Sequence, residues 1–143
     1  MRKKYSEGDI FIIPMQDGRF AVCQVVCALK GRFKKAFSFG VIRLGADEPN
    51  VEDGDFLSYR FGNRQSNVIF TSPENLRNGT WKIVGHIPLT PDKEELQVFQ
   101  CAGHLYRGDE YIRNLSKDEY GKFNTLGAAG YELVQIHLSE MKQ

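Results

Sequence analysis

The sequence predicts an α+β fold that is mainly antiparallel β: a small bent sheet or partly open barrel with a C-terminal strand-helix-strand segment. Two observations predict it. Through residues 1–90, short runs rich in β-branched and aromatic residues alternate with glycine, proline and asparagine turn signals. After residue 90, a helix-start signal stands between two further apolar runs.

The expected strands share apolar runs of strand length, and they cover residues 10–13, 20–29, 36–44, 56–61, 67–70, 81–87, 96–101 and 131–138. Asp17-Gly18 provides the positive-φ pair of a tight turn after the first strand. Residues 30–35 form the charged tip of the second hairpin, and Gly62-Asn63 turns between the fourth and fifth strands. Residues 45–55 lack apolar periodicity and are expected to form a polar loop.

Helix signals are fewer. A serine followed by proline predicts about one helical turn within residues 72–79, and residues 88–95 are expected to connect the two parts of the chain.

The tail carries the strongest helix signal. Ser116 and Glu119 have the spacing of a capping box, which predicts a helix over residues 116–129 with Gly130 as its left-handed C-terminal cap. Residues 131–138 alternate and are expected to form the last strand.

The length of 143 residues fits a single domain over residues 1–143, with a β-rich part (1–90) and a β-α-β appendage (91–143) packed on it. No apolar run is long enough to cross a bilayer, and the first residues lack an export signal. We therefore expect a cytoplasmic protein with no membrane partner and, since three cysteines are an odd number, with reduced thiols.

The net charge of +1 hides an uneven distribution. Residues 1–43 carry nine Lys or Arg against three Asp or Glu, whereas residues 44–56 carry five acids and no base. The five acids are Asp47, Glu48, Glu52, Asp53 and Asp55. The alternating ligand spacing of a calcium loop is missing. The cluster is therefore expected to be either a solvated loop or a docking surface for a basic partner.

A basic counterpart lies in the tip of the second hairpin, which holds Lys30, Arg32, Phe33, Lys34 and Lys35. Cations interleaved with an aromatic ring can bind phosphates and stack bases, so this is the candidate nucleic-acid site. The isoelectric point of about 7.7 is low for that role. The plainer alternative is a hairpin tip that lysines keep soluble and protected from edge pairing.

Catalytic and metal patterns are weak. Cys23 and Cys27 lie four residues apart on one expected strand, about 13 Å, face the same way as Val25 and are read as core residues. Cys101 and His104 form the only close Cys/His pair, which leaves a thiol nucleophile as a minor alternative. The three histidines lack zinc-site spacing. We therefore expect no enzyme, no cofactor and no metal.

Two stretches resemble a known family. Residues 7–20, which include Gly8-Asp9 and Asp17-Gly18, are similar, together with Gln24-Val25-Val26, to the opening of the immunity protein 26 family of bacterial polymorphic toxin systems. Residues 81–88 resemble that family's later strand. Residues 126–134 look like a helix-to-strand joint of small bacterial domains, which bears on fold only.

The resemblance implies a protein that binds a cognate toxin and blocks it without catalysis. If that toxin is a nuclease with a basic cleft, the acidic loop would mimic phosphate charge. The alternative is a small barrel that binds nucleic acid through residues 30–35, and nucleic acid is the less favoured partner. The sequence leaves the toxin, the contact surface and the oligomeric state open.

Overall fold

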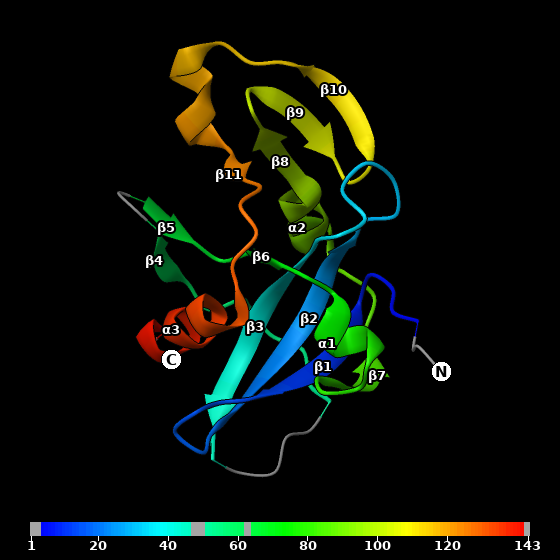
Figure 1. Ribbon diagram of the computed structural model, residues 1–143, viewed down its shortest axis with the longest axis vertical. Coiled ribbons are helices and arrows are strands. Elements are labelled where there is room, and N and C mark those ends of the chain that lie inside the picture. The colour runs from blue at the N-terminus through cyan, green and yellow to red at the C-terminus, as the bar shows by residue number, and fades with distance from the viewer. Residues whose placement is uncertain (1–3, 47–50, 62–63, 142–143) are drawn as a thin grey trace.

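A computed structural model describes residues 4–46, 51–61 and 64–141 (Figure 1). Its largest element is a five-stranded antiparallel sheet in the order β6-β3-β2-β1-β7. The strands are β1 (Asp9–Pro14), β2 (Phe20–Ala28), β3 (Phe37–Gly45), β6 (Ile69–Thr71) and β7 (Lys82–His86).

A second sheet lies at one end of the first and has the order β10-β9-β8-β11 (Figure 1). It consists of β8 (Val98–Cys101), β9 (His104–Arg107), β10 (Glu110–Asn114) and β11 (Asn124–Thr125). β11 pairs parallel to β8, and the other pairs are antiparallel. β4 (Tyr59–Phe61) and β5 (Arg64–Ser66) form a separate hairpin.

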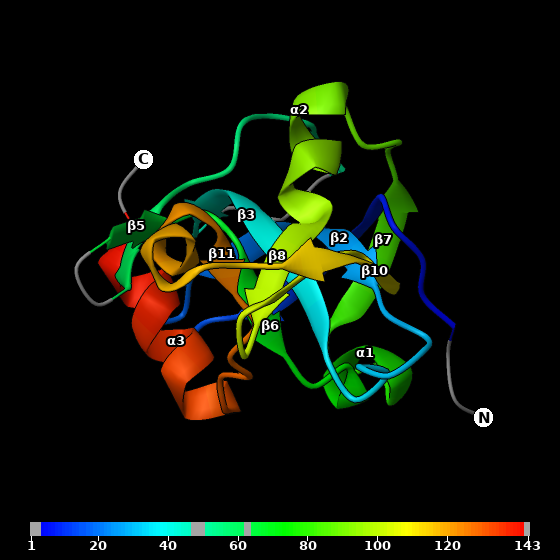
Figure 2. The ribbon, with the colours of Figure 1, turned by 90° about the horizontal axis from the view of Figure 1, so that it is seen from above.

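The helices are short, and Figure 2 shows α2 and α1 on opposite sides of the large sheet. They are α1 (Glu74–Arg77), α2 (Pro91–Glu94), the 3-10 turns η1 (Glu95–Gln97) and η2 (Lys117–Lys122), and α3 (Tyr131–Glu140). No helix in the described part of the chain is long and apolar enough to cross a membrane. The α+β class with mainly antiparallel strands is confirmed, and the described strands close no barrel.

The first hairpin forms as predicted, with one correction at its turn. Gly18 has a φ of +89°, but Asp17 does not have a positive φ. The N–H of Gly18 donates to the carbonyl of Met15 (3.1 Å), and the N–H of Met15 donates to the carbonyl of Arg19 (2.8 Å). This pattern is typical of a three-residue hairpin loop, which needs only one left-handed residue.

The main core lies on one face of the large sheet. Phe37, Phe39 and Val41 share that face as predicted and are fully buried. Phe11 stacks on Trp81 at 5.9 Å between ring centroids and meets Phe39 edge-on at 5.3 Å. Burying such rings is the largest favourable contribution to folding, roughly 2–3 kcal/mol each.

A second core joins the two sheets. Val26, Cys27 and Phe70 of the large sheet pack with Phe99 and Tyr106 of the second one. A register shift between Val25 and Cys27 moves Cys27 into this cluster, whereas Cys23 lies in the main core. The prediction that both thiols face the same way as Val25 is therefore wrong, because a β-bulge interrupts the alternation.

The predicted order of helix and strand in the tail is wrong. The capping box at Ser116 is present, but the helix it starts is the 3-10 turn η2, which ends at Lys122. Residues 131–138 are helical within α3, and Gly130 is its N-cap with a φ of −68°. Buried positions along α3 are Val134, His137, Leu138 and the following Met141. This is helical spacing, and Ile136, which two-residue alternation would bury, is 51% exposed.

Two smaller predictions also differ. The sequence predicts one strand at residues 67–70, after the strand at 56–61. The chain forms two short strands there, β5 and β6, and β6 pairs with β3. The turn Gly62-Asn63 lies outside the described residues. The connector 88–95 contains the helical turn α2, because Thr90 caps it and Pro91 occupies its first position.

Candidate functional site

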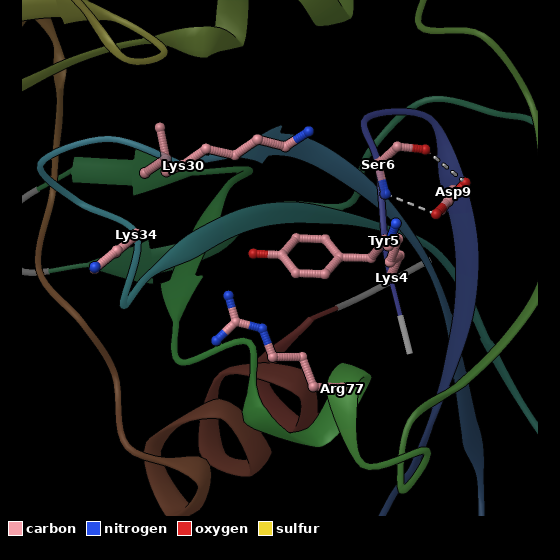
Figure 3. Close-up of a pocket in the computed structure, with 8 residues that line it drawn as sticks. Lys4, Tyr5, Ser6, Asp9, Lys30, Lys34 and Arg77 are labelled. Atoms are coloured by element: carbon pink, nitrogen blue, oxygen red, sulfur yellow. Dashed lines mark hydrogen bonds between the residues drawn. The ribbon is translucent and has the colours of Figure 1, made fainter. Parts of the chain in front are cut away.

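A basic groove opens beside the end of the large sheet where β2 leaves it (Figure 3). It is a cavity of about 770 Å³ lined by Lys4, Tyr5, Ser6, Asp9, Leu29, Lys30, Lys34 and Arg77. These residues come from three segments: the N-terminal chain up to the first residue of β1, the β2–β3 turn and helix α1. The volume lies within the range of ordinary ligand sites and is large enough for several amino-acid side chains.

Tyr5 and Arg77 build the floor of the basic groove. The Tyr5 ring packs edge-on against Phe37 at 5.6 Å, and the Arg77 guanidinium lies 5.9 Å from the centre of that ring. In Figure 3 the Tyr5 hydroxyl points toward the β2–β3 turn, with Arg77 rising from α1 beneath it. Burial raises the pKa of the Tyr5 hydroxyl, and the Arg77 charge offsets part of that rise. The hydroxyl is therefore a neutral hydrogen-bond donor at neutral pH.

Carboxylates near the basic groove are already engaged. Asp9 accepts hydrogen bonds from the Ser6 N–H (2.8 Å) and contacts the His86 ring nitrogen (2.9 Å). Asp109 accepts from the backbone N–H groups of Lys30 and Gly31 at 3.0–3.1 Å. Among the described residues, no carboxylate lies within ion-pairing distance of the side-chain charges of the groove, which belong to Lys4, Lys30, Lys34 and Arg77. The groove is therefore a region of positive potential.

The basic tip predicted from the sequence is divided by the structure. Lys30 and Lys34 line the groove. Phe33 instead packs edge-on against Tyr106 (4.9 Å) and Phe99 (5.7 Å) in the second core, with Arg32 over its outer face. Lys35 is exposed outside the groove lining. The Phe33 ring is thus occupied by internal packing, and the base-stacking platform of the nucleic-acid alternative has no support here.

The acidic loop is partly tied to the body of the protein. Glu52 pairs with Arg43 at 2.5 Å, and Asp53 pairs with Lys93 at 2.7 Å. Asp55 is exposed. Asp47 and Glu48 lie outside the described residues.

Lys93 holds the segment 51–56 against the sheet. Its side chain is only 8% exposed, and its amine donates both to the buried Gln24 side chain (2.7 Å) and to Asp53. The same amine lies 4.5 Å from the centre of the Phe56 ring. Gln24 in turn donates to the carbonyl of Ile87 at 2.6 Å. The side chains of Asp53, Lys93 and Gln24 are therefore all hydrogen-bonded within this network, as burial of polar groups requires.

The Asp53 ion pair predicts a pH dependence. The Lys93 amine holds the pKa of the Asp53 carboxyl below its ordinary 3.8, so the charged form stabilises the folded state. This contribution is present above pH 3.8 and is lost as pH falls through the lowered folded-state pKa. We expect the free energy of unfolding to fall less steeply below pH 4 in Asp53→Asn than in the wild type, measured by urea unfolding at several pH values. If the free energy of unfolding of the two proteins fell equally steeply below pH 4, the stabilising role of the Asp53–Lys93 ion pair would be contradicted.

Two of the three cysteines, Cys23 and Cys27, are buried. Burial raises the pKa of Cys23 well above its ordinary value and that of Cys27 to about 12, so both thiols stay protonated. Cys101 and His104 are cross-strand neighbours, and the His104 ring bonds to Asn114 at 2.7 Å, but among the described residues the Cys101 thiol makes no hydrogen bond to that ring. Within the described residues, no group of three or more His, Cys, Asp or Glu is arranged to hold a metal.

Comparison with known protein families identifies the family to which this sequence belongs. The model of the family described as immunity protein 26 matches residues 6–105. The chain belongs to the immunity protein 26 family. No curated protein and no solved structure matches it.

The Gly8-Asp9 pair of this immunity protein has a structural role in the fold. Gly8 has a φ of +94°, and a Cβ on it would lie 2.7 Å from the carbonyl oxygen of Ile87. Its own N–H donates to Val25, and its carbonyl accepts from Ile87. The pair therefore fixes how the chain enters β1 between β2 and β7.

Sequence reasoning missed three residues of this immunity protein's charged sites. Lys4 and Arg77 join Lys30 and Lys34 only because the fold brings α1 and the N-terminal segment to the same turn. Lys93 gave no signal, since a lysine in a polar stretch is normally solvated. The excess of bases in residues 1–43 and the basic hairpin tip 30–35 were the sequence features that pointed to the groove.

Proposed function

We propose that this immunity protein neutralises a cognate bacterial toxin by binding it directly and that it does so without chemical change to the toxin. The observation that carries the proposal is the family match over residues 6–105, which spans the whole large sheet and most of the groove lining. The protonated state of the two buried thiols agrees with a binding role.

The acidic loop remains a candidate contact surface. Because Glu52 and Asp53 are held by Arg43 and Lys93, they fix the position of the segment. Asp55 is the described acid of this loop that is exposed and outside those two pairs. If the toxin presents a basic cleft, Asp55 would carry phosphate mimicry together with Asp47 and Glu48.

The test is direct. The product of the neighbouring reading frame is taken as the candidate toxin, and its toxic domain is produced with and without this protein in a bacterial host. We expect survival only with co-expression. We also expect co-elution of the two purified proteins in size-exclusion chromatography and a dissociation constant in the nanomolar range or below by calorimetry.

A toxin from an unrelated locus is the control and should neither co-elute nor be neutralised. Survival without any detectable complex would contradict neutralisation by binding. Loss of protection on charge reversal at Asp55, with unchanged folding, would support the acidic loop as part of the contact surface. Unchanged protection after reversal at Asp47, Glu48 and Asp55 together would remove it.

A further inference from the structure

The basic groove combines charge, shape and a hydrogen-bond donor in one place. Its four cationic side chains have no described carboxylate partner. The four cations outnumber the Asp9 carboxylate of the lining, and an acidic ligand would relieve the repulsion among them. Tyr5 adds a neutral donor.

This chemistry fits carboxylates on a folded protein surface. Arg77 can form the bidentate bond that a guanidinium makes with a carboxylate, and the lysines can follow acidic side chains of varied geometry. A polynucleotide would also meet the charge, but the partly buried Phe33 ring packs against Phe99 and Tyr106 and lies under the Arg32 guanidinium, which leaves it poorly placed to stack on a base. The groove therefore favours an acidic protein segment over RNA.

We propose that the basic groove is the docking site for an acidic segment of the cognate toxin. This inference rests on the proposed function and names the surface and the partner chemistry that it uses. Residues 6–105 include six of the eight lining residues, so the groove lies mostly in the part of the chain that matches the family.

The test reverses charge in the groove and, as a matched control, elsewhere. Lys30→Glu/Lys34→Glu changes the groove, whereas Lys117→Glu/Lys122→Glu changes two exposed lysines of η2 by the same net charge. Binding to the purified toxin domain is measured by surface plasmon resonance at low and high salt. We expect the groove variant to lose at least about 100-fold in affinity, mostly through slower association at low salt, and the control to change less than about threefold.

Three further measurements check that the variants fold and test the alternative that the groove binds nucleic acid. Thermal melts verify that each variant folds, and Lys30→Gln/Lys34→Gln gives a milder change that should weaken binding about tenfold. Equal binding by the groove and control variants would overturn the groove proposal while leaving toxin neutralisation intact. A gel shift with generic RNA that only the groove variant loses, with toxin affinity unchanged, would assign the groove to nucleic acid instead. If the wild type binds no toxin, both proposals fall.

Discussion

Replacing Lys93 by alanine is expected to lower the free energy of unfolding by about 2–4 kcal/mol. The amine of this nearly buried side chain is shared between Gln24 and Asp53, and it lies over the Phe56 ring. Removing it leaves the Gln24 oxygen without its donor and releases the segment 51–56 from the sheet. Breaking a fully buried pair costs somewhat more, but Asp53 is 43% exposed, and solvent reduces the loss.

Urea unfolding of three variants measures this contribution. Lys93→Met keeps most of the aliphatic packing, so its free energy of unfolding should fall less than that of Lys93→Ala. The difference between the two variants measures the cost of the cavity separately from the loss of the charge. Lys117→Ala, at an exposed position, should stay within about 0.5 kcal/mol of the wild type. If Lys93→Ala also stays within that limit, the contacts of Lys93 with Gln24, Asp53 and Phe56 do not stabilise the fold. Faster proteolysis within residues 51–56 in Lys93→Ala would show that the segment has been released.

Gly8→Ala is expected to be of similar severity, a loss of about 2–4 kcal/mol in the free energy of unfolding. Two causes add. A φ of +94° is unfavourable for any residue with a Cβ, and the added atom would lie 2.7 Å from the backbone oxygen of Ile87, which cannot rotate away. β1 and β7 would have to separate where Gly8 and Ile87 share a hydrogen bond.

Gly18→Ala provides the matched control for that prediction. Its φ of +89° is almost the same, but nothing lies within 4 Å of an added Cβ. It should therefore show the backbone strain alone, about 1 kcal/mol, in thermal or urea unfolding. Equal losses in the two variants would mean that the close approach at Ile87 contributes nothing.

The β-rich part of the fold could be predicted because its signals are local. A turn residue such as Gly18 acts within a few positions, and the alternation of Phe37, Phe39 and Val41 reports a buried face directly. In the tail, local signals were ambiguous. A capping box fixes where a helix starts and not how far it runs, and the apolar residues of 131–138 fit both periods until tertiary packing chooses the helical one.

The charged sites could be predicted only in part from the sequence, for a different reason. Lys30 and Lys34 were found because they are neighbours in sequence, whereas Arg77 reaches the same groove only through the placement of α1. The acidic loop was visible as a cluster, but its pairing with Arg43 and Lys93 is a tertiary property. Contacts between distant segments carry no local pattern, so a single sequence cannot reveal them.

Titration of toxin activity with this immunity protein tests the central claim most directly. A protein that neutralises by binding should reduce activity linearly with added protein until a fixed molar ratio is reached, and activity should return when the complex is separated in denaturant and the toxin is refolded. Inactivation of many toxin molecules by each immunity protein, persisting after the two are separated, would show that the protein acts as an enzyme and would contradict the account.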